Sequence, residues 1–140
     1  MKLLKVITSI SVAVLLAGLA ACGGGGKYGE IRTVLERQVA LFEEYGTSID
    51  QATGAKDVAA AMNKLAAGMA ELAPQFKSIA EKYPDLGKNE PPAELKDLFS
   101  KLQAAGMKMA TAMAKTAQYM QDPEVKTAQQ KLTEAMARPR

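Results

Sequence analysis

Apolar residues recur at alternating steps of four and three through the middle of this chain, and this heptad repeat restricts the possible fold more than any other feature. The repeat runs through Val58, Met62, Leu65, Met69, Leu72, Phe76, Ile79 and Tyr83. Such spacing places all of these side chains on one stripe of an α-helix. Because isolated helices are marginally stable in water, the stripe must pack against further helices. The repeat therefore predicts an all-α helical bundle.

Helical periodicity covers most of the rest of the chain. We expect helices at about 30–52, 57–83, 92–120 and 123–137. The third repeats the apolar seam at Leu95, Phe99, Leu102, Gly106, Met109, Met113, Thr116 and Met120. Pro91 and Pro92 open that segment, and Asp122 with Pro123 forms an N-cap and first-turn pair for the fourth helix. Short connections make consecutive helices neighbours, which predicts an antiparallel helical bundle of three long helices plus a shorter fourth.

Two features of the second segment lead to more detailed predictions. Pro74 lies inside it, where proline bends or breaks a helix, but the heptad phase continues past it. We therefore expect one kinked helix over 57–83. Gly68 and Gly106 are both 19 residues from Gly87 in the connecting turn. In an antiparallel pair they would lie at the same level, so we expect the second and third helices to approach most closely there, unless the equal spacing is a coincidence.

Residues 1–21 have the three zones of an export signal. Lys2 and Lys5 provide a short positive region, residues 6–16 are almost wholly apolar, and small residues lead to Cys22. The alternative is a transmembrane helix. Residues 6–21 would reach only about 24 Å as a helix, whereas a hydrocarbon core of about 30 Å needs about 20 residues. A cleaved signal peptide fits this length better.

The segment Leu19, Ala20, Ala21 and Cys22 resembles the lipobox of bacterial prolipoproteins, and the likeness extends over residues 1 to about 26. The resemblance implies that Cys22 is S-diacylglycerylated and that a lipoprotein signal peptidase cuts before it. It also implies that the new amino terminus can be acylated. A cysteine carrying two or more chains anchors a protein stably to a membrane. The implied location is the cell envelope, and Gly23 favours the outer membrane, on its periplasmic face, if the cell is Gram-negative.

The sequence after Cys22 divides into a tether and one domain. Four glycines follow the cysteine directly, so residues 22–29 are expected to be a lipidated, Gly-rich tether and residues 30–140 the bundle. Cys22 is the only cysteine, which excludes an intramolecular disulfide. After residue 26 the chain loosely resembles small helical lipoproteins of unknown role in Gram-negative bacteria, through its Pro91-Pro92 and Asp122-Pro123 helix starts.

Composition argues against several function classes. The chain has 18 Lys and Arg against 15 Asp and Glu, and removal of Lys2 and Lys5 with the signal leaves 16 against 15, which argues against a nucleic-acid partner. With no histidine, the usual general base and imidazole metal ligand are absent. We expect no enzyme activity, no cofactor and no metal. Glu43 and Glu44 are expected to lie on a solvated helix face, the alternative being a catalytic carboxylate pair.

Three lysines form the other candidate site. Lys101, Lys108 and Lys115 are seven residues apart and share one face of the third predicted helix. This face is either simply solvated or a basic strip that contacts anionic headgroups or an acidic partner.

Three function classes remain. We favour a membrane-anchored, non-enzymatic interaction module whose helical surface binds an unknown envelope protein or the cell wall. The alternative is a carrier of a lipid or another apolar ligand within the bundle, which an apolar cavity between the seams would favour. The third class, an enzyme, would need a polar cleft.

Overall fold

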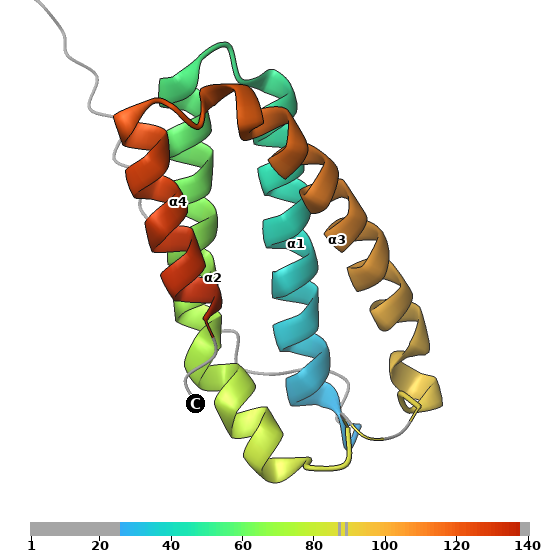
Figure 1. The fold of residues 1–140 in the computed structure, drawn as a ribbon. Coiled ribbons are helices and arrows are strands. Elements are labelled where there is room, and N and C mark those ends of the chain that lie inside the picture. Colours follow the sequence, from blue (N-terminus) through green and yellow to red (C-terminus); the bar gives the residue numbers. More distant parts are fainter. Residues whose placement is uncertain (1–25, 87, 89, 138–140) are drawn as a thin grey trace, which may run out of the picture.

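The computed structural model describes residues 26–137 except 87 and 89. Four α-helices and two short 3₁₀-helices account for most of this part (Figure 1). They are α1 (Gly29–Gln51), α2 (Ala55–Lys82), η1 (Ala93–Leu95), α3 (Lys96–Thr116), η2 (Ala117–Tyr119) and α4 (Pro123–Met136). The predicted all-α fold, three long helices plus a shorter fourth, is confirmed. The third predicted segment comprises η1, α3 and η2.

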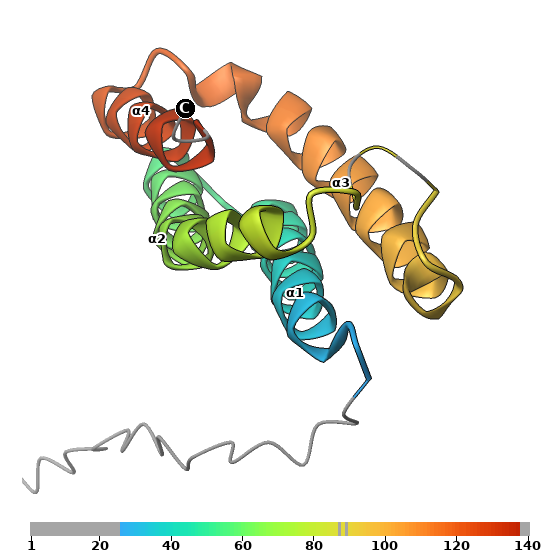
Figure 2. The same cartoon turned by 90° about the horizontal axis from the view of Figure 1, so that it is seen from below.

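Consecutive helices run in opposite directions, but the helices do not pack in chain order. α1 packs against both α2 and α3, and α2 packs against both α1 and α4. Seen along the bundle, the order is α4, α2, α1, α3, and the four helices form an arc (Figure 2). α1 and α3 are therefore parallel neighbours, as are α2 and α4 (Figure 1). We call the end where α1 begins and α2 ends the tether end.

The predicted close approach of the second and third helices is wrong. α3 packs on α1 instead, and a Cβ added at Gly106 would have no neighbour within 4 Å. Gly68 does mark a close approach, but to α1, where Leu41 fills the space beside it. The physical reason lies in α2, whose apolar surface is already divided between α1 and α4.

The seam predicted for the second helix forms the core from Val58 to Leu72, whereas Phe76, Ile79 and Tyr83 are only half-buried. α1 and α2 each bury two adjoining stripes, since each lies between two neighbours. Buried residues of α1 include Ile31, Leu35, Phe42, Tyr45 and Ile49, and those of α2 include Val58, Met62, Leu65, Met69 and Leu72. Ala59, Ala61 and Ala66 are also buried. The alanine-rich surface of α2 thus matches a central position in the bundle.

The predicted seam of the third segment is only partly correct. Leu95 and Thr116 are buried, but Phe99, Leu102, Met109 and Met113 are half-buried. The stripe that α3 buries against α1 is instead Leu98, Ala105, Ala112 and Thr116. These positions are rotated toward α1, and the small alanines let the two helices approach closely. The larger apolar side chains consequently face the inner side of the arc.

The start of α4 and the course of α2 at Pro74 are as the sequence predicts. α2 continues through Pro74 as one helix, and its last turns bend away from the upper axis (Figure 1). Asp122 caps α4, because its Oδ1 accepts hydrogen bonds from the backbone N–H groups of Glu124 (2.8 Å) and Val125 (3.4 Å). Pro123 occupies the first turn, as expected.

Candidate functional site

The predicted lipidation site lies outside the described residues. Cys22 and the peptidase recognition residues Leu19, Ala20 and Ala21 precede Gly26, the first residue that the structure describes. From Gly26 onward, no helix is long and apolar enough to cross a membrane. Lipidation of Cys22 therefore remains a prediction from the sequence.

The start of the described chain is attached firmly to the end of α2. Tyr83 donates a hydrogen bond from its hydroxyl to the carbonyl of Lys27 (3.0 Å), and its ring lies 6.0 Å from the ring of Tyr28. One turn further, the Lys82 ammonium lies 2.9 Å from a Glu30 carboxylate oxygen, and Glu30 raises the pKa of Lys82. These contacts hold residues 27–30 against the end of α2.

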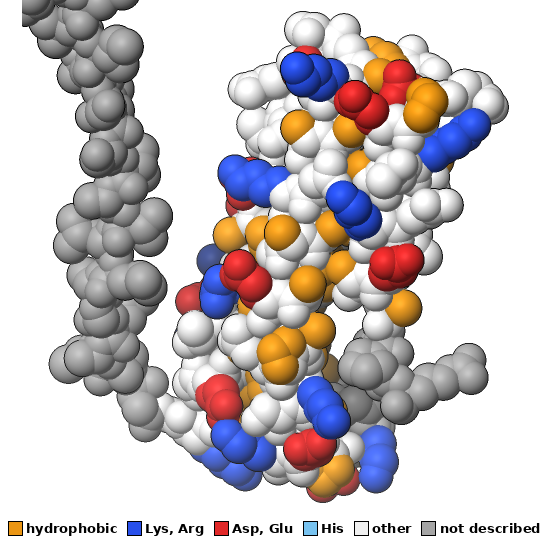
Figure 3. Space-filling view, turned by 90° about the vertical axis from the view of Figure 1, so that its left-hand side faces the viewer, with side chains coloured by type: hydrophobic (Ala, Val, Ile, Leu, Met, Phe, Trp, Pro, Cys, Tyr) orange, Lys and Arg blue, Asp and Glu red, His pale blue; other side chains and the backbone are white. Residues whose placement is uncertain are grey.

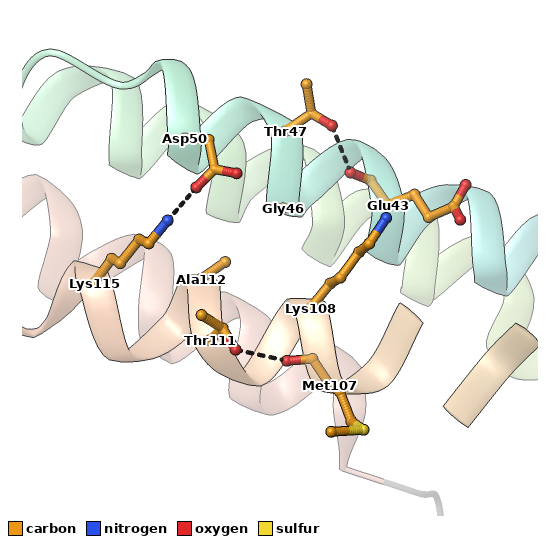
Figure 4. Close-up of a pocket in the computed structure, with 9 residues that line it drawn as sticks. All are labelled: Glu43, Gly46, Thr47, Asp50, Met107, Lys108, Thr111, Ala112 and Lys115. Atoms are coloured by element: carbon orange, nitrogen blue, oxygen red, sulfur yellow. Dashed lines mark hydrogen bonds and ion pairs between the residues drawn. The ribbon is translucent and has the colours of Figure 1, made fainter. Parts of the chain in front are cut away.

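The three lysines of the predicted basic strip lie on the side of α3 that borders α1. All three are exposed, and Lys115 forms an ion pair with Asp50 (Figure 4). Lys108 and Glu43 line the same hollow, one heptad earlier in each helix. Two lysines of the strip are thus matched by two α1 carboxylates, which lowers the net positive charge of this face. The solvated-face interpretation accounts for this arrangement.

A hollow of about 460 Å³ lies between α1 and α3, beside Lys108 and Lys115. It is bordered by Glu43, Gly46, Thr47, Asp50, Met107, Lys108, Thr111, Ala112 and Lys115 (Figure 4). α1 and α3 lie close together here, since a Cβ built at Gly46 would be in van der Waals contact with the Cβ of Lys108, at 3.8 Å. Met107 stands at the rim and is 68% exposed, although methionine is an apolar residue. The hollow is thus lined by two carboxylates, two ammonium groups and one exposed apolar side chain, that of Met107.

A second hollow, of about 610 Å³, lies at the tether end beside the first turns of α3. Its lining is Glu90, Pro91, Lys96, Phe99, Ser100, Leu102 and Gln103. Phe99 and Leu102 are half-buried here, and Lys96 pairs with Glu90 at 3.5 Å. Because α4 ends at Met136, no fourth helix extends over this part of the bundle (Figure 1). The hollow is mainly apolar and open.

One polar group is buried in the core without a hydrogen bond. The Tyr45 hydroxyl has no partner among the described residues, and the residue is only 2% exposed. The side chain of Thr116 lies nearby, and its hydroxyl donates to the carbonyl of Met113 (2.7 Å). Burial raises the pKa of the Tyr45 hydroxyl, while the nearby Thr116 acts in the opposite direction. The site lies at the α1–α3 contact.

Neither metal-ligand chemistry nor similarity identifies a further site. Within the described part of the chain, no group of three or more Cys, Asp or Glu side chains is arranged to hold a metal ion. Compared with protein families, with curated proteins and with solved structures, the chain matches none of them.

The two hollows were missed by reasoning from the sequence. The heptad spacing of Glu43 and Asp50 is visible in the sequence and equals that of Lys108 and Lys115. Pairing the two rows, however, requires knowing that α1 and α3 are parallel neighbours. The tether-end hollow depends on the same packing, because it leaves Phe99 and Leu102 on the inner side of the arc.

Proposed function

We propose that this protein is a lipid-anchored component of a bacterial cell envelope, in which the helical bundle is a non-enzymatic interaction module. The observation that carries the proposal is the sequence around Cys22. This single cysteine follows Leu19, Ala20 and Ala21, and four glycines separate it from a folded domain. The first helix of that domain begins at Gly29, so the bundle would be held close to the membrane.

Labelling the protein in cells with an alkyne-bearing fatty acid tests the anchor. The wild-type chain should be labelled, and its intact mass should match a chain that begins at a diacylglyceryl-modified Cys22. The variant Cys22→Ser should lose the label, whereas the neighbouring substitution Gly24→Ala should retain it. An unmodified thiol at Cys22 in the mature chain would contradict the anchor.

The surface that best suits a protein partner is the groove between α1 and α3. Methionine is enriched in protein–protein interfaces, whose rims are polar. Met107 meets this description, since Lys108 and Thr111 flank it on α3 and Glu43 and Asp50 lie across the groove. The α2 and α4 side also presents charges of both signs, with apolar side chains between them (Figure 3).

A photo-reactive amino acid placed in the groove tests this surface. Replacement of Met107 by benzoylphenylalanine should yield a discrete cross-linked product when living cells are irradiated. The matched control is the same replacement at Gln129, which is exposed in the middle of α4. Equal yields at the two positions, or none at Met107, would contradict the proposed surface.

The alternative function, a carrier of a lipid or another apolar ligand, is supported by the half-buried row on the inner side of α3. Phe99, Leu102, Met109 and Met113 present apolar atoms that the bundle covers only in part. Native mass spectrometry of the protein purified from its own membranes separates the two functions. A stoichiometric small molecule beyond the anchor supports the carrier, and its absence leaves the interaction module.

A further inference from the structure

The tether end of the bundle is within short reach of the predicted anchor. The backbone N–H of Gly29 donates to the carbonyl of Gly26 (3.0 Å), and Tyr83 holds Lys27, so Gly26 is fixed beside the end of α2. From Gly26 to Cys22 the chain has four Cα steps, which span at most about 14 Å when fully extended. If Cys22 carries acyl chains, this end must lie close to the bilayer.

The first turns of α3 lie at this same end. Arg32 in the first turns of α1 donates a hydrogen bond to the carbonyl of Glu94, just before α3 begins (2.7 Å). The start of α1, the end of α2 and the start of α3 consequently lie together (Figures 1 and 2). The hollow lined by Pro91, Phe99 and Leu102 is therefore on the part of the bundle nearest to the anchor.

α4, which packs on α2, does not reach the tether end. The 14 residues of α4 extend about 21 Å, whereas the 28 residues of α2 extend about 42 Å. Since α4 starts at the opposite end, it lies beside only the upper part of α2 (Figure 1). α4 therefore does not lie at the tether end, where Pro91, Phe99 and Leu102 are half-buried.

Charge at the tether end is nearly balanced. Lys82 pairs with Glu30, Lys96 lies 3.5 Å from Glu90, and Lys88 lies 3.9 Å from Asp85. Blue and red side chains accordingly lie side by side at the lower end of the face in Figure 3. A surface of this kind is not attracted specifically by anionic headgroups. Its affinity for a membrane would come from apolar contact.

We propose that the tether-end patch, made up of Pro91, Phe99 and Leu102, rests in the boundary between headgroups and acyl chains of the bilayer that holds Cys22. This inference rests on the proposed lipid anchor. A few apolar side chains bind a membrane weakly by themselves, but a short tether makes the second contact intramolecular and raises its effective concentration. The bundle would then stand on the membrane with the α3–α4 connection turned away from it.

Tryptophan reporters test the orientation, because the chain contains no tryptophan. Phe99→Trp places a reporter in the patch, and Tyr119→Trp is the matched control. Both replaced residues are half-buried aromatics, and they are about 30 Å apart along the helix axis. Each lipidated variant is purified from membranes and reconstituted into phosphatidylcholine vesicles with brominated acyl chains, with and without phosphatidylglycerol.

Bromolipid should quench Phe99→Trp at least threefold more than Tyr119→Trp, to the same extent with and without the anionic lipid. Leu102→Trp, a second reporter in the patch, should behave like Phe99→Trp, and circular dichroism establishes that all three variants are folded. Equal quenching at positions 99 and 119 would overturn the inference. So would an unquenched Phe99→Trp whose emission shifts with protein concentration, which would identify a second copy of the chain on the patch.

The test separates failure of the inference from failure of the anchor. Intact mass of each reconstituted variant shows whether Cys22 carries diacylglycerol, independently of fluorescence. An unmodified Cys22 would refute the proposed function and the inference together. A lipidated protein that stays with the vesicles but has equal quenching at the two reporters would refute the orientation alone.

Discussion

Leu41 of α1 packs directly over Gly68 of α2, in the space that a side chain at position 68 would otherwise occupy. A Cβ built on Gly68 would lie 2.8 Å from Cδ1 of Leu41 and 3.2 Å from its Cγ. Distances this short are not found for real Cβ atoms, so the absence of a side chain at Gly68 sets how closely α1 and α2 pack. Gly106, which is also inside a helix, has no neighbour within 4 Å of the same position.

The two mid-helix glycines should respond differently to the same substitution. Gly106→Ala should raise the free energy of unfolding by about 0.5–1 kcal/mol, because alanine favours the helix and meets no obstacle. Gly68→Ala should be less stable than Gly106→Ala by about 1–3 kcal/mol, since it overpacks against Leu41. Urea unfolding followed by circular dichroism measures both. Equal effects would show that α1 and α2 are not in close contact at Gly68.

The heptad pattern was sufficient to predict the helices and the core of α1 and α2. Each of these helices is covered on two sides, so most of its large apolar residues are buried, although Leu41, Phe76 and Ile79 are only half-buried. The pattern did not predict the position of α3. α3 approaches α1 through Ala105 and Ala112, and in a sequence alanines at a contact are indistinguishable from alanines that only favour the helix.

The candidate sites also differ in whether the sequence alone can predict them. The anchor at Cys22 is read from consecutive residues, so its prediction needs no tertiary structure. The ion pair of Lys115 with Asp50 joins residues 65 apart in the chain, and only the parallel packing of α1 and α3 brings them together. The tether-end patch depends on the same packing of α3. Spacing along one helix does not contain this information.

Engineered disulfides should distinguish the observed helix order from the order that the sequence predicted. Disulfide-bonded cysteines have Cβ atoms about 3.5–4.5 Å apart. Gly46 and Lys108 satisfy this distance, with 3.8 Å from a Cβ built at Gly46 to that of Lys108. The double variant Gly46→Cys/Lys108→Cys should therefore form an internal disulfide under mild oxidation, with Cys22 occupied by its lipid or replaced by alanine.

The control for this experiment is Gly68→Cys/Gly106→Cys, the pair expected to meet if α2 and α3 were closest neighbours. It should remain reduced under the same conditions, while circular dichroism reports the folded state of both variants. Mobility on a non-reducing gel and the mass of tryptic fragments identify the bond. A disulfide in the second pair and not in the first would contradict the packing of α3 on α1.

Tyr45→Phe should stabilise the protein. The Tyr45 hydroxyl is buried without a hydrogen-bond partner among the described residues, and such a group costs about 1–3 kcal/mol. Removal of the oxygen should therefore raise the free energy of unfolding by about 1 kcal/mol. Tyr83→Phe is the matched control, since it removes a hydroxyl that does donate a hydrogen bond, to Lys27, and should lower stability. A loss of stability in Tyr45→Phe would indicate that the hydroxyl is satisfied.

The same tyrosine should weaken the fold at alkaline pH. Burial raises the pKa of Tyr45 above its ordinary value of 10.0. Above that pH the unfolded chain releases the proton more readily than the folded one, so stability falls as the pH rises. The difference in melting temperature between Tyr45→Phe and the wild type should therefore widen above pH 10. A constant difference would refute the titration of Tyr45.

Because of Asp57, part of the stability of the fold should be lost as the pH falls. It accepts hydrogen bonds from the backbone N–H of Thr53 (3.0 Å) and from the Thr53 hydroxyl (2.8 Å), and these bonds lower its pKa. A carboxyl whose pKa is lower in the folded state adds stability above the pKa of the unfolded chain, and this stability is lost as the pH falls through the folded value. Asp57→Asn should thus melt at a lower temperature than the wild type at pH 7, and the two curves should converge at acid pH, as the Asp57 carboxyl becomes protonated in the folded protein. Thr53→Val, which removes only the hydroxyl donor, should lie between them at pH 7. Parallel curves for Asp57→Asn and the wild type across this range would mean that the Thr53 contacts at the start of α2 do not depend on the charge of Asp57.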